Sequence, residues 1–120
     1  MTNVKVLLVD DEVEFVETLA ERLRTRGFDV DVATSGTQAV EKTKSTTFNA
    51  VVVDFVMPMM DGIETIKALK KVNPELPFIL LSGQATIKAA MDAARLGAVD
   101  VLEKPVDIGT IVEKITQAHG

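Results

Sequence analysis

The chain contains no cysteine, no tryptophan and no tyrosine, and only one histidine among its 120 residues. Without cysteine, disulfide bonds and thiolate metal sites are excluded. The lone His119 is next to the last residue, and we interpret it as a helix C-terminal residue that favours the helix dipole rather than as a ligand. Any metal site in this chain must therefore be built from oxygen ligands.

Long apolar runs and an excess of basic residues are also missing. The apolar stretch nearest the N-terminus, Val6–Val9, runs directly into Asp10, Asp11 and Glu12 and is too short for a signal peptide or a membrane span. The net charge is −5, and no basic cluster is available to neutralise phosphates, which argues against direct nucleic-acid binding. We expect a soluble, cytoplasmic protein without a membrane partner.

The residues that are present suffice for one folded domain. Apolar residues make up 47% of the chain and charged residues 26%, and no low-complexity linker interrupts them. A domain of this length buries roughly two-thirds of its unfolded surface. We predict a single domain over residues 1–120.

Short apolar runs alternate with segments of helical periodicity. The five runs are Lys5–Val9, Asp29–Ala33, Ala50–Val53, Phe78–Leu81 and Val99–Leu102. Strict alternation predicts an α/β fold with a parallel sheet covered by helices on both faces. With right-handed crossovers, the common solution at this length is a doubly wound, flavodoxin-like three-layer sandwich with five helices and strand order 2-1-3-4-5.

Five helices are predicted between and after these runs. Gly27 ends the first, Ser35 has the spacing of a capping-box residue for the second, and Asn73-Pro74 ends the third. Their apolar faces lie at Phe15–Leu23, within Thr37–Lys44, at Ile63–Leu69, within Ala85–Leu96 and at Ile108–Ile115. Each helix therefore has an apolar stripe for the sheet and a charged outer face.

Polar residues follow four of the apolar runs. They are Asp10 and Asp11, Asp54, Ser82, and Lys104. Because the carboxyl ends of parallel strands meet at one edge, we expect these side chains to converge where open α/β sheets bind ligands.

Converging carboxylates either raise one another's pKa or bind a divalent cation, and an all-oxygen set suits Mg²⁺, Mn²⁺ or Ca²⁺. Asp54, at the end of a buried strand, can act as a nucleophile toward phosphorus, and Lys104 can act as its counter-ion. Simpler interpretations exist: Asp10, Asp11 and Glu12 could cap the first helix, Asp54 could form a turn, and Lys104 could be a surface charge.

The polar positions together resemble the signature of response-regulator receiver domains of two-component signalling. The resemblance covers the whole chain in order and is carried by Asp10-Asp11, Asp54, Met57-Pro58, Asp61-Gly62, Ser82 and Lys104-Pro105.

The resemblance implies a phosphoacceptor. Asp54 would accept a phosphoryl group from the phosphohistidine of a sensor histidine kinase or phosphotransfer protein, and the domain would catalyse its own phosphorylation and slow dephosphorylation. Mg²⁺, with Mn²⁺ as a possible substitute, would be held by Asp11, by Asp10 through water, by Asp54 and by the Val56 carbonyl.

The same resemblance assigns the remaining site residues. Lys104 would contact the phosphate and the Asp54 carboxylate, and its bond to Pro105 would be cis. Ser82 would move to the phosphate and signal its presence to a downstream output domain or protein.

Two departures from the family pattern affect switching and lifetime. Val101 stands where the family usually has an aromatic ring, so an aromatic switch is not expected. Val56 and Gln84 occupy the positions that flank the hydrolytic water, and an apolar Val56 predicts a long-lived acyl phosphate.

The resemblance also predicts two interaction surfaces. The helix at Ala85–Leu96, the last strand and the helix at Ile108–Ala118 would form the output face and a possible homodimer interface. The segment Glu14–Leu23 would face the kinase.

Three alternatives are weighed against a phosphoacceptor. An FMN-binding protein of this fold is disfavoured because Asp10-Asp11-Glu12 would repel the flavin phosphate, and a haloacid-dehalogenase-type phosphatase because Val56 stands where its second aspartate is needed. A phosphorylation-independent interaction module of the same fold stays open.

Overall fold

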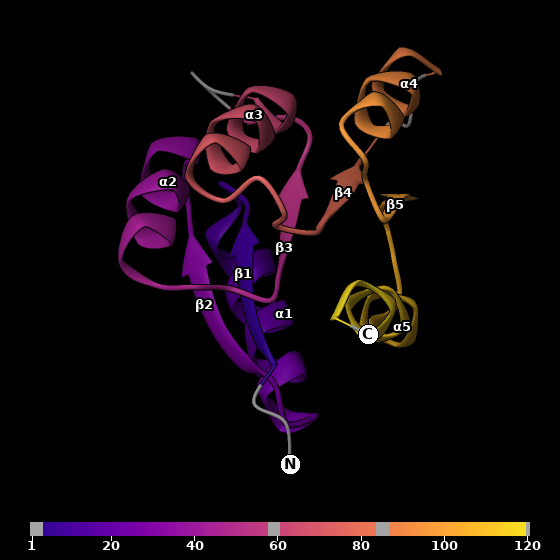
Figure 1. Cartoon of the computed structure of the whole chain (residues 1–120). Helices are drawn as coiled ribbons and strands as arrows, with labels where there is room; N and C mark the ends of the chain where they lie inside the picture. The colour runs from indigo at the N-terminus through magenta and orange to yellow at the C-terminus, as the bar shows by residue number, and fades with distance from the viewer. Residues whose placement is uncertain (1–3, 58–60, 84–86, 120) are drawn as a thin grey trace.

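The structure is a computed structural model that describes residues 4–57, 61–83 and 87–119 (Figure 1). Strands and helices alternate along the chain without exception in the described part. In order they are β1 (Lys5–Val9), α1 (Val13–Thr25), β2 (Asp29–Ala33), α2 (Gly36–Ser45), β3 (Ala50–Asp54), α3 (Gly62–Val72), β4 (Phe78–Ser82), α4 (Ile87–Arg95), β5 (Asp100–Glu103) and α5 (Ile108–His119).

The five strands form one parallel sheet in the order β2-β1-β3-β4-β5, which confirms the predicted topology. β1 and β3 lie side by side with Val9 opposite Val53, so the next residue of each strand, Asp10 and Asp54, reaches the same edge. The switch in strand order therefore lies between the two strands that carry the acidic residues.

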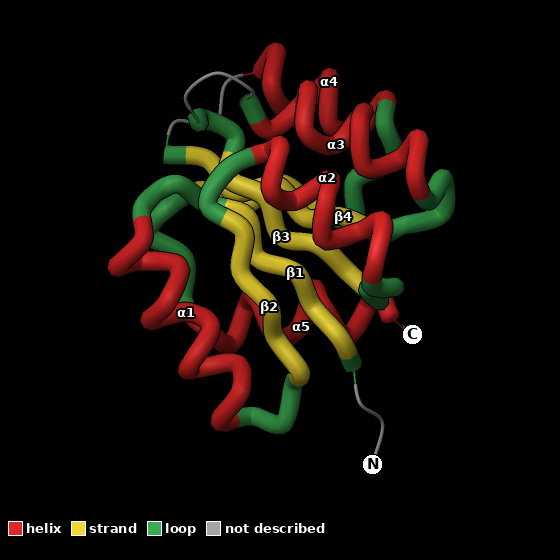
Figure 2. Tube along the Cα trace, turned by 90° about the vertical axis from the view of Figure 1, so that its left-hand side faces the viewer, coloured by secondary structure: helices red, strands yellow, loops and turns green. Residues whose placement is uncertain are grey.

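Helices cover both faces of the sheet, as Figure 2 shows. Alternate residues of each strand point to opposite faces. On one face, Leu8 and Val52 belong to a buried cluster with Val16 of α1 and Ile111 of α5. On the other face, the cluster contains Leu7, Val51 and Leu80 of the sheet, Ile66 and Leu69 of α3, and Ala93 of α4. The three-layer sandwich is thus confirmed.

Local sequence signals account for the helix ends. The Ser35 hydroxyl accepts a hydrogen bond from the Gln38 amide (3.1 Å), and Asp61 and Glu64 form a complete capping box at the start of α3. Gly27 and Gly97 have φ angles of 94° and 84°, the left-handed conformation that ends a helix with little strain in glycine. The stop at Gly27 was predicted.

The strand limits differ slightly from the sequence prediction. β3 and β4 each extend by one residue and include Asp54 and Ser82, whereas β5 begins at Asp100 instead of Val99. Ala85, the predicted start of the fourth helix, lies outside the described residues. Among the described helices, none combines the length and apolarity that crossing a bilayer requires.

Candidate functional site

The strand ends bring Asp10, Asp54 and Lys104 together through backbone pairing that continues past the strands. The Asp10 amide donates to the Ala33 carbonyl (3.1 Å), and the Lys104 amide donates to the Ser82 carbonyl (2.7 Å). These bonds fix the directions in which the strand-end residues leave the sheet. The predicted convergence of the strand ends is therefore confirmed for these three side chains.

The Lys104 ammonium lies among three carboxylates. Its Nζ is 3.0 Å from Asp10 Oδ2, 3.2 Å from Glu12 Oε1 and 3.3 Å from Asp54 Oδ1. We call these four residues the rim cluster. One positive charge thus faces three negative charges.

Burial is uneven across the rim cluster. Asp10 and Asp54 are only 2% and 5% exposed, whereas the Glu12 side chain is 65% exposed. Asp10 Oδ1 also accepts a hydrogen bond from the Glu12 amide (2.9 Å). Two of the three carboxylates are therefore largely removed from water, which disfavours their charged forms.

The pKa values reflect this burial. Loss of hydration raises the pKa of Asp54 to about 6; the Asp10 charge adds to this rise, and Lys104 opposes it. Burial also raises the pKa of Asp10, against hydrogen bonds from Glu12 and Lys104. Burial lowers the pKa of Lys104, but the hydrogen bond and charge of Asp10, together with the charge of Asp54, outweigh it and raise that pKa overall.

An open cleft of about 510 Å³ lies over the Asp54 carboxylate. Its lining residues are Asp11, Glu12, Asp54, Val56, Gly83 and Lys104. The Val56 residue is 66% exposed, so an apolar surface borders the cleft beside the acidic groups. The cleft leaves space above Asp54 for a phosphoryl group.

The donor set fits a hard divalent cation. Asp10, Glu12 and Asp54 each offer a carboxylate oxygen, and these atoms lie within 4.8 Å of one another. All the donors are oxygen atoms, as Mg²⁺ prefers. Asp11 lies on the cleft wall, and its predicted role and that of the Val56 carbonyl stay predictions.

Gly62 allows α3 to approach the end of β3. A Cβ atom at this position would lie 2.5 Å from the Asp54 carbonyl oxygen and 2.8 Å from the Phe55 Cα, closer than atoms can pack. The Gly62 amide also donates to the Phe55 carbonyl (2.8 Å). The Asp61-Gly62 pair of the sequence therefore caps α3 and holds the segment that follows Asp54.

Two residues of the site were not predicted in their observed roles. Glu12 is the N-cap residue of α1, but its side chain makes no capping hydrogen bond and pairs with Lys104 instead, so the capping interpretation of its side chain is wrong. The Phe15 ring lies under the ammonium, 4.6 Å from Lys104 Nζ to the ring centroid. Nothing in the sequence pattern distinguishes Phe15 from an ordinary core residue of α1.

The structure also describes most of the other positions that the sequence singled out. Ser82 is fully buried at the end of β4, and the Lys104-Pro105 bond is cis, as predicted. Val101 is half-buried and packs against the core on the α3 side of the sheet. Gln84 lies outside the described residues.

Comparison with known proteins places this geometry in a family. The family model described as the response regulator receiver domain matches residues 6–116. The Transcriptional regulatory protein ZraR of Escherichia coli K12 is 34% identical over 116 residues, which are 97% of this chain and 26% of that protein. The chain thus spans about a quarter of the length of the curated relatives it matches.

Solved structures agree with this match. The Francisella response regulator 1452 receiver domain is 28% identical, with a TM-score of 0.89 over 98% of this chain and 97% of that one. A response regulator of Burkholderia pseudomallei, solved with a phosphorylated aspartic acid, calcium ion and citrate, is 29% identical, with a TM-score of 0.89 over 97% of this chain and 69% of that one. On its sequence, topology and strand-end geometry, the chain belongs to the response regulator receiver domain family of two-component signalling.

Proposed function

We propose that Asp54 accepts a phosphoryl group from the phosphohistidine of a histidine kinase or phosphotransfer protein. The observation that supports this most is the placement of Asp54: its carboxylate is nearly buried, lines an open cleft and lies 3.3 Å from Lys104 Nζ. With a pKa of about 6, the carboxyl group is mostly ionised at neutral pH. An ionised carboxylate is the form that acts as a nucleophile.

The transfer exchanges one bond for another. A carboxylate oxygen of Asp54 forms a bond to phosphorus while the bond from phosphorus to the donor imidazole nitrogen breaks. The nitrogen leaves with the electron pair and takes up a proton from solvent. Lys104, already within 3.3 Å of Asp54, lies where it can balance charge on the transferred group.

Asp10, Asp11, Asp54 and the Val56 carbonyl would hold Mg²⁺ or Mn²⁺, with Glu12 as a further candidate donor. The cation would offset the negative charge of the phosphoryl oxygens at the acidic cleft. The Burkholderia pseudomallei regulator, which carries a phosphorylated aspartic acid and a calcium ion, supports this assignment.

A groove between α1 and α5 is our proposed docking site for the phosphodonor protein. It has a volume of about 380 Å³, and Phe15, Leu19, Ile108 and Ile111 form its apolar part. It adjoins the rim cluster through Phe15, so a donor seated there would bring its phosphohistidine near Asp54. We expect the exchange to take place in the cytoplasm, where response regulators generally act.

The effect of phosphorylation would then pass to an output domain or protein from the carboxyl end of β4, where Ser82 lies. Because Ser82 is fully buried at the end of β4, contact with a phosphoryl group in the cleft would require Ser82 to move. Val101 offers no ring for an aromatic switch, so we assign the response to α4, β5 and α5, the surface that would also serve a homodimer.

The test is incubation with Mg²⁺ and a small-molecule phosphodonor, followed by mass spectrometry of the intact chain. We expect one added phosphoryl group, lost on chelation and in Asp54→Asn. Asp31→Asn is the matched control, because Asp31 is a half-exposed aspartate that pairs with Lys42 and does not line the cleft. No addition with any donor would favour the phosphorylation-independent interaction module.

Val56 allows a second test at the same site. An exposed valine cannot orient a hydrolytic water, so we expect a long-lived acyl phosphate, and Val56→Asn should accelerate phosphate release. Release from the purified phosphorylated protein measures this. A wild-type lifetime as short as that of the fastest receiver domains, or an unchanged rate in Val56→Asn, would contradict it.

A further inference from the structure

We infer that Phe15 is a positioning residue for Lys104 and that its ring links the α1–α5 groove to the rim cluster. The phosphorylation measurement that tests this inference rests on the proposed function, whereas the positioning of Lys104 by Phe15 rests on the observed contacts. Phe15 lies in the first turn of α1, whereas Lys104 follows β5, so the tertiary fold alone brings them together.

The position of the Lys104 ammonium supports this role of Phe15. Lys104 Nζ lies 4.6 Å from the Phe15 ring centroid, within the distance at which a ring face attracts a cation. The Lys104 side chain is only 17% exposed, so water screens this attraction weakly. The ring and the carboxylates of Asp10 and Asp54 therefore jointly fix the position of the ammonium.

The three carboxylates alone would leave the Lys104 ammonium several positions. Asp10, Glu12 and Asp54 all lie within 3.3 Å of Nζ, and the exposed Glu12 competes with the buried pair. A fixed ring limits where the nitrogen can go. Because the Phe15 ring packs against the core cluster, it favours the arrangement in which Lys104 stays next to Asp54.

The Phe15 ring also lies in the groove between α1 and α5. Phe15 lines the α1–α5 groove together with Leu19, Val106, Ile108 and Ile111. It is half-buried and packs against the core cluster that contains Leu19 and Ile111. An apolar side chain that enters the groove would contact the Phe15 ring. Occupancy of the groove would therefore change the position of the Lys104 ammonium next to Asp54.

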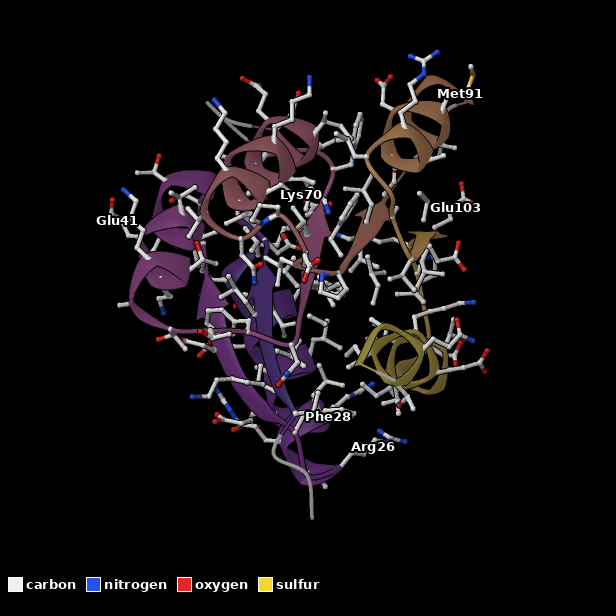
Figure 3. The ribbon with its side chains drawn as sticks, viewed as in Figure 1. Arg26, Phe28, Glu41, Lys70, Met91 and Glu103 are labelled. Atoms are coloured by element: carbon white, nitrogen blue, oxygen red, sulfur yellow. The ribbon has the colours of Figure 1, made fainter. Side chains whose placement is uncertain are left out.

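The test compares three variants in the full chain. Phe15→Leu removes the ring and keeps an apolar side chain, and Phe15→Tyr keeps the ring. Phe28→Leu is the matched control, because Phe28 is a half-buried phenylalanine packed against the same core cluster. Figure 3 shows Phe28 at the lower end of the molecule, away from Glu103, the chain neighbour of Lys104.

Two readouts are used. The first is the rate of phosphorylation by a small-molecule donor at saturating Mg²⁺, where no partner protein contributes. The second is the NMR chemical shift of the Lys104 Cε and Hε nuclei, which ring currents move and which requires no activity. We expect Phe15→Leu to slow phosphorylation about three- to tenfold, the effect of a cation–π contact of ordinary strength. It should also shift the Lys104 signals, while Phe15→Tyr and Phe28→Leu stay within about twofold of wild type.

The outcomes separate this inference from the proposed function. Wild-type-like Lys104 signals in Phe15→Leu would overturn the inference, and so would equal slowing in Phe15→Leu and Phe28→Leu. If the wild-type chain takes up no phosphoryl group, the proposed function fails, and the Lys104 signals alone decide whether Phe15 positions the ammonium.

Discussion

Lysine–carboxylate pairs occur in this domain in two settings with opposite effects on the acid. On the surface, Lys42 Nζ lies 2.7 Å from Asp31 Oδ1, and both side chains are substantially exposed. Burial is the largest single influence on Asp31 and disfavours its charge, but the hydrogen bonds from Lys42 and the Val32 amide, together with the charges of Lys42 and Arg24, outweigh it and lower its pKa. In the rim cluster, where Lys104 Nζ lies 3.3 Å from Asp54 Oδ1, the pKa of Asp54 is raised to about 6.

The difference lies in burial and charge balance. The surface pair is half-exposed and joins one ammonium to one carboxylate, whereas the rim cluster places three carboxylates around Lys104 with Asp10 and Asp54 buried. A raised acid pKa means that the ionised form is less stable in the folded than in the unfolded chain. The surface pair therefore stabilises the fold, whereas the ionised Asp54 destabilises it. That ionised carboxylate is the form that would act as the proposed nucleophile.

The largest stability effect should come from removing the rim cation. We expect Lys104→Met to lower the free energy of unfolding by about 2–4 kcal/mol, because buried carboxylates then face each other without compensation. Lys42→Met should lower it by less than about 1 kcal/mol, as is usual for an exposed pair. Urea denaturation in EDTA at neutral pH measures both, and equal losses would contradict the comparison.

Removing the Asp54 charge should change the free energy of unfolding in the opposite direction. We expect Asp54→Asn to raise the free energy of unfolding at pH 7.5 by about 1–3 kcal/mol, because a rise in pKa from 3.8 to about 6 corresponds to at most about 3 kcal/mol. The same urea experiment applies. A less stable Asp54→Asn would show that the carboxylate is a net stabiliser.

The pH dependence of these two acids should run in opposite directions. Because the folded pKa of Asp54 is above 3.8, the destabilisation is complete above about pH 6 and disappears as the pH falls below about 4. The stabilisation from Asp31, whose folded pKa is lowered, is present above pH 3.8 and is lost as the pH falls through the folded value. Comparing Asp54→Asn and Asp31→Asn with wild type across this range checks both signs.

A divalent cation should reverse part of the rim destabilisation. At about ten times its dissociation constant, Mg²⁺ should raise the free energy of unfolding by about 1.4 kcal/mol, through binding to the folded state alone. Thermal denaturation with and without chelator measures this. Asp10→Asn should weaken the effect and Asp31→Asn should leave it unchanged; a similar response in both variants would indicate a non-specific salt effect.

The smallest effect should be at the surface pair itself. We expect Asp31→Asn to lower the free energy of unfolding by less than about 1 kcal/mol near pH 7, because both partners remain solvated. About 0.5 M salt should reduce this loss further by screening. A loss as large as that in Lys104→Met would remove the distinction between the two settings.

The fold and the strand-end residues could be predicted from sequence because each depends on local or periodic signals. Alternating runs defined the sheet, and a parallel sheet brings its carboxyl ends to one edge, which is why Asp10, Asp54 and Lys104 converged as expected. The contacts of Lys104 with Glu12 and Phe15 join residues about ninety positions apart and depend on the direction of single side chains. No periodicity encodes such contacts.

We propose that the excess carboxylates of the rim cluster serve cation-dependent phosphoryl transfer to Asp54. The most direct test is the extent of phosphorylation by a small-molecule donor as a function of Mg²⁺ concentration, with the modified residue located by peptide mass spectrometry. We predict uptake of one phosphoryl group that saturates with Mg²⁺ and maps to Asp54. Uptake that is independent of Mg²⁺, or that maps to another residue, would overturn this role of Asp54.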